Sequence, residues 1–357
     1  MKGLVYGSTI GAAYLAARLA QAGWDVEWQL AEFRPRLRPA RVSVEALRLL
    51  RAVGARGGDR MTFLGKAPGL ESWGLPSGVR YGFAWGKNSS ADRWVDRQEL
   101  FESLKKIAVA SGVKVFERRM LVPPSLQHFG ELPVFLDAPV EDLAGWPLVR
   151  NRLRTERIEA AELWLPQGRI AQGAPCQFQK LEGAQAFLEP HPRGGYSLSF
   201  YASSRYPIER ALESLRNSRG AGPAPWRALF MVNPGARVQT LTFRVGNPGF
   251  VAPGAFVFGE SLGTAHPAAN LDELESLEQA ERLVALWPTS EGPEMDRDSL
   301  LRLSEAWNHK EGSRLTRIWE RGRLLGRLLF SDEGRKYALP AASFLPRALR
   351  RFLHAPI

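Results

Sequence analysis

The first thirty residues carry an apolar pattern that predicts a strand, a helix and a second strand. Residues 2–6 are short and apolar, residues 13–22 are rich in Ala and Leu, and residues 25–30 begin a second strand. Gly23 ends the predicted helix, and small residues at positions 7–12 predict a tight turn before it. We therefore expect the chain to open on a βαβ unit.

The rest of the chain alternates between helical and β-rich stretches. Helical spacing of apolar residues predicts helices at residues 42–53, 96–110, 271–286 and 296–329. Short apolar strands are predicted at residues 113–117, 132–136 and 255–258, and residues 55–90 predict further short strands. Between 155 and 250, an antiparallel sheet with one helix at 207–216 is predicted by the segments 160–165, 177–181, 196–201 and 238–245. This order predicts an α/β fold in which a β-rich sheet is inserted into a Rossmann-like domain.

The turn at residues 7–12 has the context of a phosphate-binding turn. Against the pattern G-x-G-x-x-G, Gly7 holds the first place, Thr9 the second and Ala12 the third. Small residues let the backbone approach a pyrophosphate, and the helix N-terminus presents N–H groups and a positive dipole end. Leu30 stands where an acid would hold a ribose hydroxyl. The turn alone is compatible with NAD, with FAD or with no ligand.

The charge balance favours anionic partners. The 357 residues carry a formal net charge of +11, with 45% hydrophobic and 24% charged residues. No helix-turn-helix, zinc or RNA-binding pattern accompanies the charge, so no nucleic-acid partner is expected. A solvated basic surface explains the same excess.

The cysteine and histidine content argues against disulfides and metals. Cys176 is the single cysteine, which fits a reducing cytoplasm, and the five histidines show no metal-ligand spacing. No apolar run is long enough to span a membrane, and the start of the chain lacks the pattern of a secretory signal. We expect a cytoplasmic protein without a metal site.

Four segments together resemble the class A flavin-dependent monooxygenases, which have a p-hydroxybenzoate-hydroxylase-like fold. The resemblance covers nearly the whole chain and rests on residues 7–12 with the following helix, on residues 41–50, on Val95-Asp96-Arg97, and on Phe256-Val257-Phe258-Gly259-Glu260. It implies a discontinuous FAD-binding Rossmann-like domain at 1–154 and 251–295. It also implies a β-rich substrate domain at 155–250 and a helical C-terminal segment at 296–357.

The resemblance implies non-covalent FAD, reduced by NADH or NADPH, and a flavin hydroperoxide that hydroxylates an aromatic or other apolar small molecule. The cofactor-binding residues that it implies are Gly7, Ser8, Thr9, Ile10, Gly11, Ala12, Glu32, Arg41, Arg97, Gly259 and Glu260. No catalytic side chain is assigned, because in this chemistry the protein places the cofactor and shields it from water. His266, in the loop expected to face the flavin, is a candidate acid or base, although a lone loop histidine is more often structural.

The chain also departs from the family at several cofactor positions. Leu30 replaces the ribose acid, with Glu27 and Glu32 as displaced substitutes, and Ala138-Pro139 stands where the family has an Asp-Gly pair. Glu260 is one methylene longer than the usual Asp, and the flavin loop at 266–272, which includes Asn270, has lost its glycines. An alternative hypothesis is therefore a relative that keeps the fold, has lost the flavin and acts as a binding or accessory protein.

The basic C-terminal segment supports a third hypothesis. Residues 344–353 could form a short amphipathic helix that contacts an anionic membrane surface. This contact is compatible with an enzyme that acts on an apolar substrate.

Overall fold

The fold was analysed in a computed structural model. The structure describes residues 1–31, 33, 36–55, 70–74, 80–84, 93–119, 121, 131–138, 156–168, 176–181, 183–216, 224–245, 254–262, 272–287 and 296–330. The predictions for Glu32, Pro139, His266, Asn270 and residues 344–353 lie outside the described residues.

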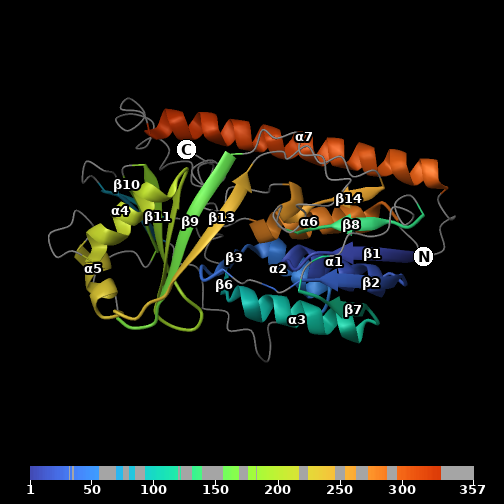
Figure 1. The fold of residues 1–357 in the computed structure, drawn as a ribbon, viewed down its shortest axis with the longest axis horizontal. Coiled ribbons are helices and arrows are strands. Elements are labelled where there is room, and N and C mark those ends of the chain that lie inside the picture. Colours follow the sequence, from blue (N-terminus) through green and yellow to red (C-terminus); the bar gives the residue numbers. More distant parts are fainter. Residues whose placement is uncertain are drawn as a thin grey trace.

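A five-stranded parallel sheet forms the first unit, in the strand order β14-β8-β1-β2-β7. Its strands are β1 (Lys2–Tyr6), β2 (Asp25–Leu30), β7 (Lys114–Glu117), β8 (Val134–Leu136) and β14 (Ala255–Val257). The helices α1 (Ile10–Gln21), α3 (Arg97–Ala110) and α6 (Asp272–Ala285) pack with it around one apolar core (Figure 1). Segments from both ends of the chain therefore complete this unit, as the discontinuous Rossmann-like domain requires.

A seven-stranded sheet forms the second unit, in the order β13-β9-β12-β11-β10-β4-β5. Its strands are β4 (Leu70–Gly74), β5 (Arg80–Ala84), β9 (Glu156–Leu165), β10 (Cys176–Leu181), β11 (Ala184–Pro190), β12 (Tyr196–Ala202) and β13 (Val238–Val245). The pairs are antiparallel except for β10 with β4, which is parallel. β4 and β5 thus join the inserted sheet, although the sequence places them in the range expected for the first unit.

One face of the seven-stranded sheet is covered by α4 (Arg205–Arg216) and α5 (Ala224–Met231). Leu163, Leu198 and Phe200 pack there against Ile208 and Trp226. The opposite face carries Glu162, Glu189 and Tyr201, and it meets the segment that leads into β3 (Ala40–Val42). β3 pairs with β6 (Arg93–Val95), and α2 (Val44–Ala52) follows it.

The long helix α7 (Arg297–Phe330) runs beside the parallel sheet next to its edge strand β14 (Figure 1). The Asn308 side chain accepts from the Val257 N–H at 2.9 Å and donates to the Ala255 carbonyl at 2.8 Å. The Trp307 indole N–H donates to the Val257 carbonyl at 2.8 Å. These side chains satisfy the exposed backbone groups of an edge strand, which would otherwise invite pairing with another chain.

Candidate functional site

The predicted phosphate-binding turn lies between β1 and α1, at the carboxyl edge of the parallel sheet. Gly7 has a positive φ of 134°, which a residue with a Cβ rarely adopts. Thr9 is the N-cap of α1 and its Oγ1 accepts from the Ala12 N–H at 3.0 Å. The first N–H groups of α1 have no partner inside the helix and carry its positive dipole end. The geometry therefore offers a site for an anion.

Asp137 already lies at this helix N-terminus. It follows β8 directly and its side chain is completely buried. Thr9 donates its hydroxyl to Asp137 Oδ2 at 2.5 Å, and the Glu260 backbone N–H donates to Oδ1 at 2.7 Å. Among the described residues, no Lys or Arg forms an ion pair with this carboxyl group.

Burial dominates the protonation of Asp137. Loss of water, the largest cause, and the nearby Glu260 carboxylate together raise its pKa to about 8, against the opposing effect of the hydrogen bonds from Thr9, Glu260 and Ala12. The Asp137 side chain is thus mostly neutral at pH 7.

Glycines converge on the same carboxyl group. A methyl group added at Gly11 or Gly259 would overlap the Asp137 carboxylate, and one at Gly7 would overlap its carbonyl oxygen. These three positions must stay small in this structure because Asp137 lies against them. The glycines alone are therefore no proof of a bound nucleotide.

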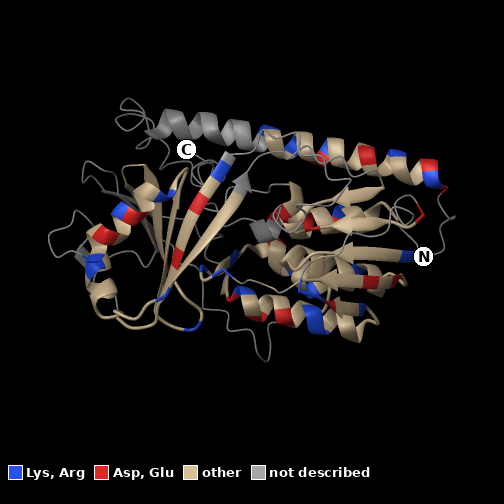
Figure 2. Cartoon of the chain, in the orientation of Figure 1, with Lys and Arg blue, Asp and Glu red and all other residues tan. Residues whose placement is uncertain are grey.

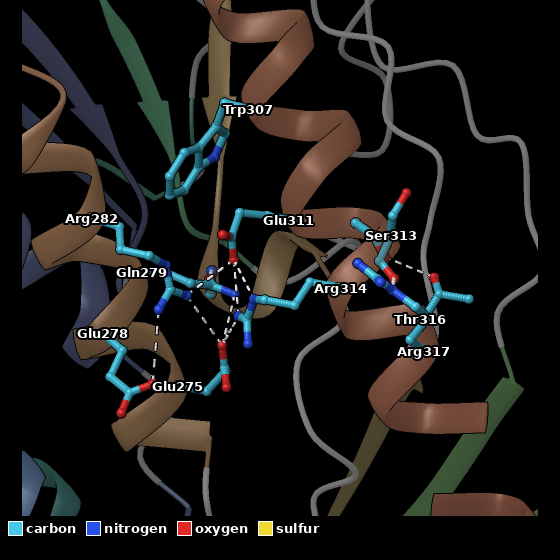
Figure 3. A network of polar contacts seen from close by, with 12 residues as sticks. Glu275, Glu278, Gln279, Arg282, Trp307, Glu311, Ser313, Arg314, Thr316 and Arg317 are labelled. Atoms are coloured by element: carbon cyan, nitrogen blue, oxygen red, sulfur yellow. Dashed lines mark hydrogen bonds and ion pairs between the residues drawn. The ribbon is translucent and has the colours of Figure 1, made fainter. Parts of the chain in front are cut away.

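Gly259 and Glu260 begin η3 (Gly259–Leu262), directly beyond β14. The Gly259 N–H donates to Gln279 Oε1 at 2.6 Å, and Gln279 lies on α6. Gln279 in turn contacts Glu275, which forms ion pairs with Arg314 and Arg282 between α6 and α7 (Figure 3). This network fixes the start of η3, and with it the N–H that reaches Asp137.

Glu311 forms the buried centre of the network in Figure 3. Its side chain is 1% exposed and pairs with Arg282 at 3.0 Å and with Arg314 at 2.9 Å. The two arginines bridge α6 to α7, so that the long helix is tied to the unit that carries the turn. This pairing balances a carboxylate that would be costly to bury alone.

The acid of the predicted ribose site is absent from its expected place. Leu30 is the last residue of β2 and is 4% exposed, so that position is apolar and buried. Glu27, one of the displaced substitutes, forms an ion pair with Lys2 at 2.8 Å near the start of β1. Glu27 is therefore engaged elsewhere, and Glu32 is outside the described residues.

Arg41 and Arg97 lie at the junction of the two units, at a different place from the turn. Arg97 opens α3, is 5% exposed, and its Nε donates to the Arg38 carbonyl at 3.0 Å. Arg41 lies on β3 with its guanidinium 5.5 Å from the Trp94 ring centroid. Within the described residues, no hydrogen bond or ion pair joins either arginine to the turn, so their predicted part in cofactor binding stays a prediction.

Sequence reasoning missed a cluster of buried ion pairs between the two units. Arg38 is completely buried, and its Nε and Nη2 donate to the two Glu189 oxygens at 2.6 and 2.7 Å. The Arg38 backbone N–H donates to Glu162 at 3.0 Å, and Arg36 pairs with Glu162 at 2.9 Å. Tyr201 donates its hydroxyl to Glu162 at 3.0 Å. A segment of the first unit is thereby fastened to the inner face of the seven-stranded sheet.

The electrostatics of this junction follow from the pairing. Burial opposes ionisation of Glu162, but Arg36, the Arg38 N–H and Arg97 together lower its pKa. His191 contacts the Leu37 backbone, and burial lowers its pKa to about 4. Arg193 forms an ion pair with Asp96 at 2.8 Å, so it is engaged with α3.

Three further expectations concern a metal site, membrane spans and the basic charge. Within the described ranges, no group of His, Cys, Asp and Glu could hold a metal ion. Among the described helices, none is long and apolar enough to cross a membrane. Figure 2 shows Lys and Arg interspersed with Asp and Glu along α3, α4 and the described part of α7, so the basic excess is not segregated on any of these helices.

The chain shares its fold with solved FAD-dependent enzymes. HpxO from Klebsiella pneumoniae, complexed with FAD and uric acid, aligns over 100% of this chain and 97% of its own, at 16% identity and a TM-score of 0.70. PqsL from Pseudomonas aeruginosa, described as a probable FAD-dependent monooxygenase, covers 96% of this chain and 99% of its own, at 14% identity and a TM-score of 0.66. A triple mutant of the flavin-dependent brominase Bmp2 covers 98% and 94%, at 12% identity and a TM-score of 0.66. No family model and no curated protein sequence matches the chain.

Proposed function

We propose that this protein is an FAD-dependent oxidoreductase of the monooxygenase type, which hydroxylates an aromatic or other apolar small molecule. The observation that carries the proposal is the match of the whole chain, both units included, to the fold of the HpxO complex with FAD and uric acid. PqsL was solved with 2-aminobenzoylacetate, a second aromatic compound, which supports the same substrate class. NADH or NADPH as the electron donor is part of the proposal.

The residues of the turn fit the pyrophosphate of FAD in outline. The first turn of α1 would bind it through the N–H groups of Ile10 and Gly11, because a helix N-terminus is a ready anion site. Glu260, half-buried at the same sheet edge, would accept a hydrogen bond from a ribitol or ribose hydroxyl. Bound flavin supplies the redox chemistry, since its reduced form reacts with O₂.

The chain's own contribution is binding, orientation and exclusion of water. Phe187, Tyr201 and Phe243 share the inner face of the seven-stranded sheet, and Arg38 and Arg36 pack against their rings. Because the Arg38–Glu189 pair ties the first unit to this face, it holds an aromatic wall at a fixed place relative to the turn. Such a dry boundary is what a reactive flavin needs, because water would otherwise consume the oxidant.

The alternative of a flavin-free relative makes a different prediction for a simple binding experiment. Purified protein is incubated with FAD, passed through a desalting column and scanned for the flavin bands near about 375 and 450 nm. Retained flavin, together with a rise in melting temperature at micromolar FAD, supports the proposal. If neither the wild-type protein nor variants of the turn retain flavin or gain melting temperature with FAD, the alternative of a flavin-free binding or accessory protein is favoured.

The reaction type is tested on the flavin-loaded protein. Bleaching of the 450 nm band by NADH or NADPH under nitrogen would identify the donor. Consumption of the donor in air would then be compared with and without a panel of aromatic acids and purine-like compounds. Faster consumption with one compound, with an oxygen atom gained by that compound in mass spectrometry, is the expected result.

Contact of residues 344–353 with anionic vesicles stays a separate prediction, tested by sedimentation at low salt.

A further inference from the structure

The Asp137 carboxyl group occupies the kind of place in which a nucleotide phosphate normally binds. It lies at the N-terminus of α1, at the carboxyl edge of the parallel sheet. Its hydrogen-bond donors are the Thr9 hydroxyl and the Glu260 backbone N–H, and the Ala12 N–H also stabilises its charged form. Hydroxyl groups and backbone N–H groups of a helix N-terminus are the usual ligands of a bound phosphate.

Thr9 departs from the nucleotide-binding pattern, and its side chain holds Asp137 at the end of α1. Thr9 stands at the second glycine position of G-x-G-x-x-G, and its hydroxyl both caps α1 and donates to Asp137. The Asp137 carboxyl group also lies against Gly11 and Gly259, and its carbonyl oxygen lies against Gly7, the one glycine that remains of the pattern. The Thr9 hydroxyl and the Asp137 carboxyl group therefore meet at the same helix end.

An ionised Asp137 and a pyrophosphate would repel each other at this helix end. No described cation forms an ion pair with Asp137 to offset the repulsion, and its complete burial leaves little water to screen it. The nearest charged group on η3 is Glu260, which adds to the negative charge. Like charges a few ångströms apart in such a setting disfavour each other, because little solvent screens their repulsion.

We propose that the Asp137 carboxylate, in its ionised form, is an internal competitor for the positive end of α1 against the pyrophosphate of FAD, so that this side chain lowers the affinity of the protein for its cofactor. The inference rests on the proposed function. It explains how the start of α1 is satisfied without a nucleotide, and it assigns to Thr9 the task of holding the competitor in place. Removal of the charge at position 137 removes the repulsion between this side chain and a pyrophosphate bound at the start of α1.

The test is a titration of the wild-type protein and of Asp137→Asn with FAD at pH 9.5, well above the pKa of about 8 of the wild-type carboxyl group. Binding is followed by quenching of tryptophan fluorescence. Asp137→Asn should bind FAD roughly tenfold more tightly than the wild type, since 1.4 kcal/mol corresponds to a factor of ten. Riboflavin, which has no phosphate, should bind both proteins equally. Asp25→Asn, a surface variant with the same change in net charge, should behave as the wild type.

The outcomes separate this inference from the proposed function. The competitor role is overturned if the wild type binds FAD and Asp137→Asn binds it no more tightly. It is also overturned if Asp137→Asn raises the affinity for FAD and for riboflavin by the same factor. In both cases the FAD proposal stands. If neither protein binds FAD at millimolar concentration, both proposals fall. Asp137→Ala serves as a second variant, and circular dichroism of each protein confirms that it is folded before titration.

Discussion

The Thr9 hydroxyl donates a 2.5 Å hydrogen bond to the Asp137 carboxyl group, across 128 residues of sequence and between the ends of β1 and β8. This contact joins the two strands at the edge of the sheet where nucleotides bind in α/β folds. It also involves Thr9, which stands at a position where the nucleotide-binding pattern has glycine. Under the proposal above, the local stability and the affinity for FAD both depend on this pair.

Replacement of Thr9 by Ala should destabilise the protein by about 2–3 kcal/mol. The variant loses both the N-cap of α1 and a donor to a buried carboxyl group. Urea denaturation measures the change. Ser43→Ala is a matched control, because the Ser43 hydroxyl caps α2 by accepting from the Ala46 N–H, and its loss should cost about 1 kcal/mol. Equal losses for the two variants would show that the Thr9–Asp137 bond contributes nothing beyond capping.

Asp137 should make the stability of the flavin-free protein fall as pH rises from 6.5 to 8. The folded protein keeps this proton up to about pH 8, whereas the unfolded chain releases it near 3.8. The folded state thus binds more protons in between, and each rise in pH favours unfolding, by at most about 1.4 kcal/mol per pH unit. Asp137→Asn should lack this contribution.

The range from pH 6.5 to 8 is chosen because the titration of His191, which has the opposite effect on stability, is complete below it. His191 has a folded pKa of about 4 against 6.5 for an ordinary histidine, so its contribution grows from pH 4 to 6.5 and is complete above that. Around Asp137, η3 contributes the charged Glu260, whereas α1 contributes Thr9 and α6 contributes Ser276, both uncharged. Parallel pH profiles for the wild type and Asp137→Asn would rule out the raised pKa.

The Arg38–Glu189 pair should behave as a buried ion pair whose partners depend on each other. Glu189→Gln should lower the free energy of unfolding by about 3–5 kcal/mol, because it leaves the Arg38 charge without its bidentate partner. Asp25→Asn, which breaks the exposed pair with Lys114, should have a far smaller effect. Chemical denaturation of both variants is the measurement, and equal small losses would contradict a structural role for the junction.

Asn308 should control the exposure of the edge strand β14. Asn308→Ala removes the partner of the Val257 N–H and of the Ala255 carbonyl, at a cost of about 1–3 kcal/mol. Hydrogen exchange of the Val257 amide should become faster. The neighbouring exposed variant His309→Ala should leave this exchange rate unchanged. An unaltered rate in Asn308→Ala would show that other contacts of α7 protect the strand.

Local patterns in the sequence predict most helices and the parallel sheet, because their apolar period and end signals are short-range. α2, α3, α6 and α7 lie within two residues of their predicted bounds, and α1 begins at Ile10, three residues before its predicted start. β4 and β5 join a sheet that is otherwise built from residues 156–245, and β11 and α5 were missed. Pairing over a hundred residues depends on the whole fold, so no local pattern reports it.

The candidate site shows the same division. The turn at residues 7–12 and the strand that leads to Gly259 could be placed from sequence, because small residues after an apolar strand have a local signature. Asp137 was visible only as a neighbour of the altered Ala138-Pro139 pair, and its contact with Thr9 arises from the adjacency of β1 and β8. Arg38 gave no signal, since an arginine in a basic, proline-rich loop is normally solvated; only the acids on the facing sheet make its burial possible.

A crystal structure of the Asp137→Asn protein with FAD tests the central claim most directly. The account predicts a pyrophosphate within hydrogen-bond distance of the Ile10 and Gly11 N–H groups at the start of α1, with the flavin ring between the parallel sheet and the inner face of the seven-stranded sheet. A turn that keeps the wild-type contacts at position 137, with FAD absent or bound elsewhere on the protein, would contradict it.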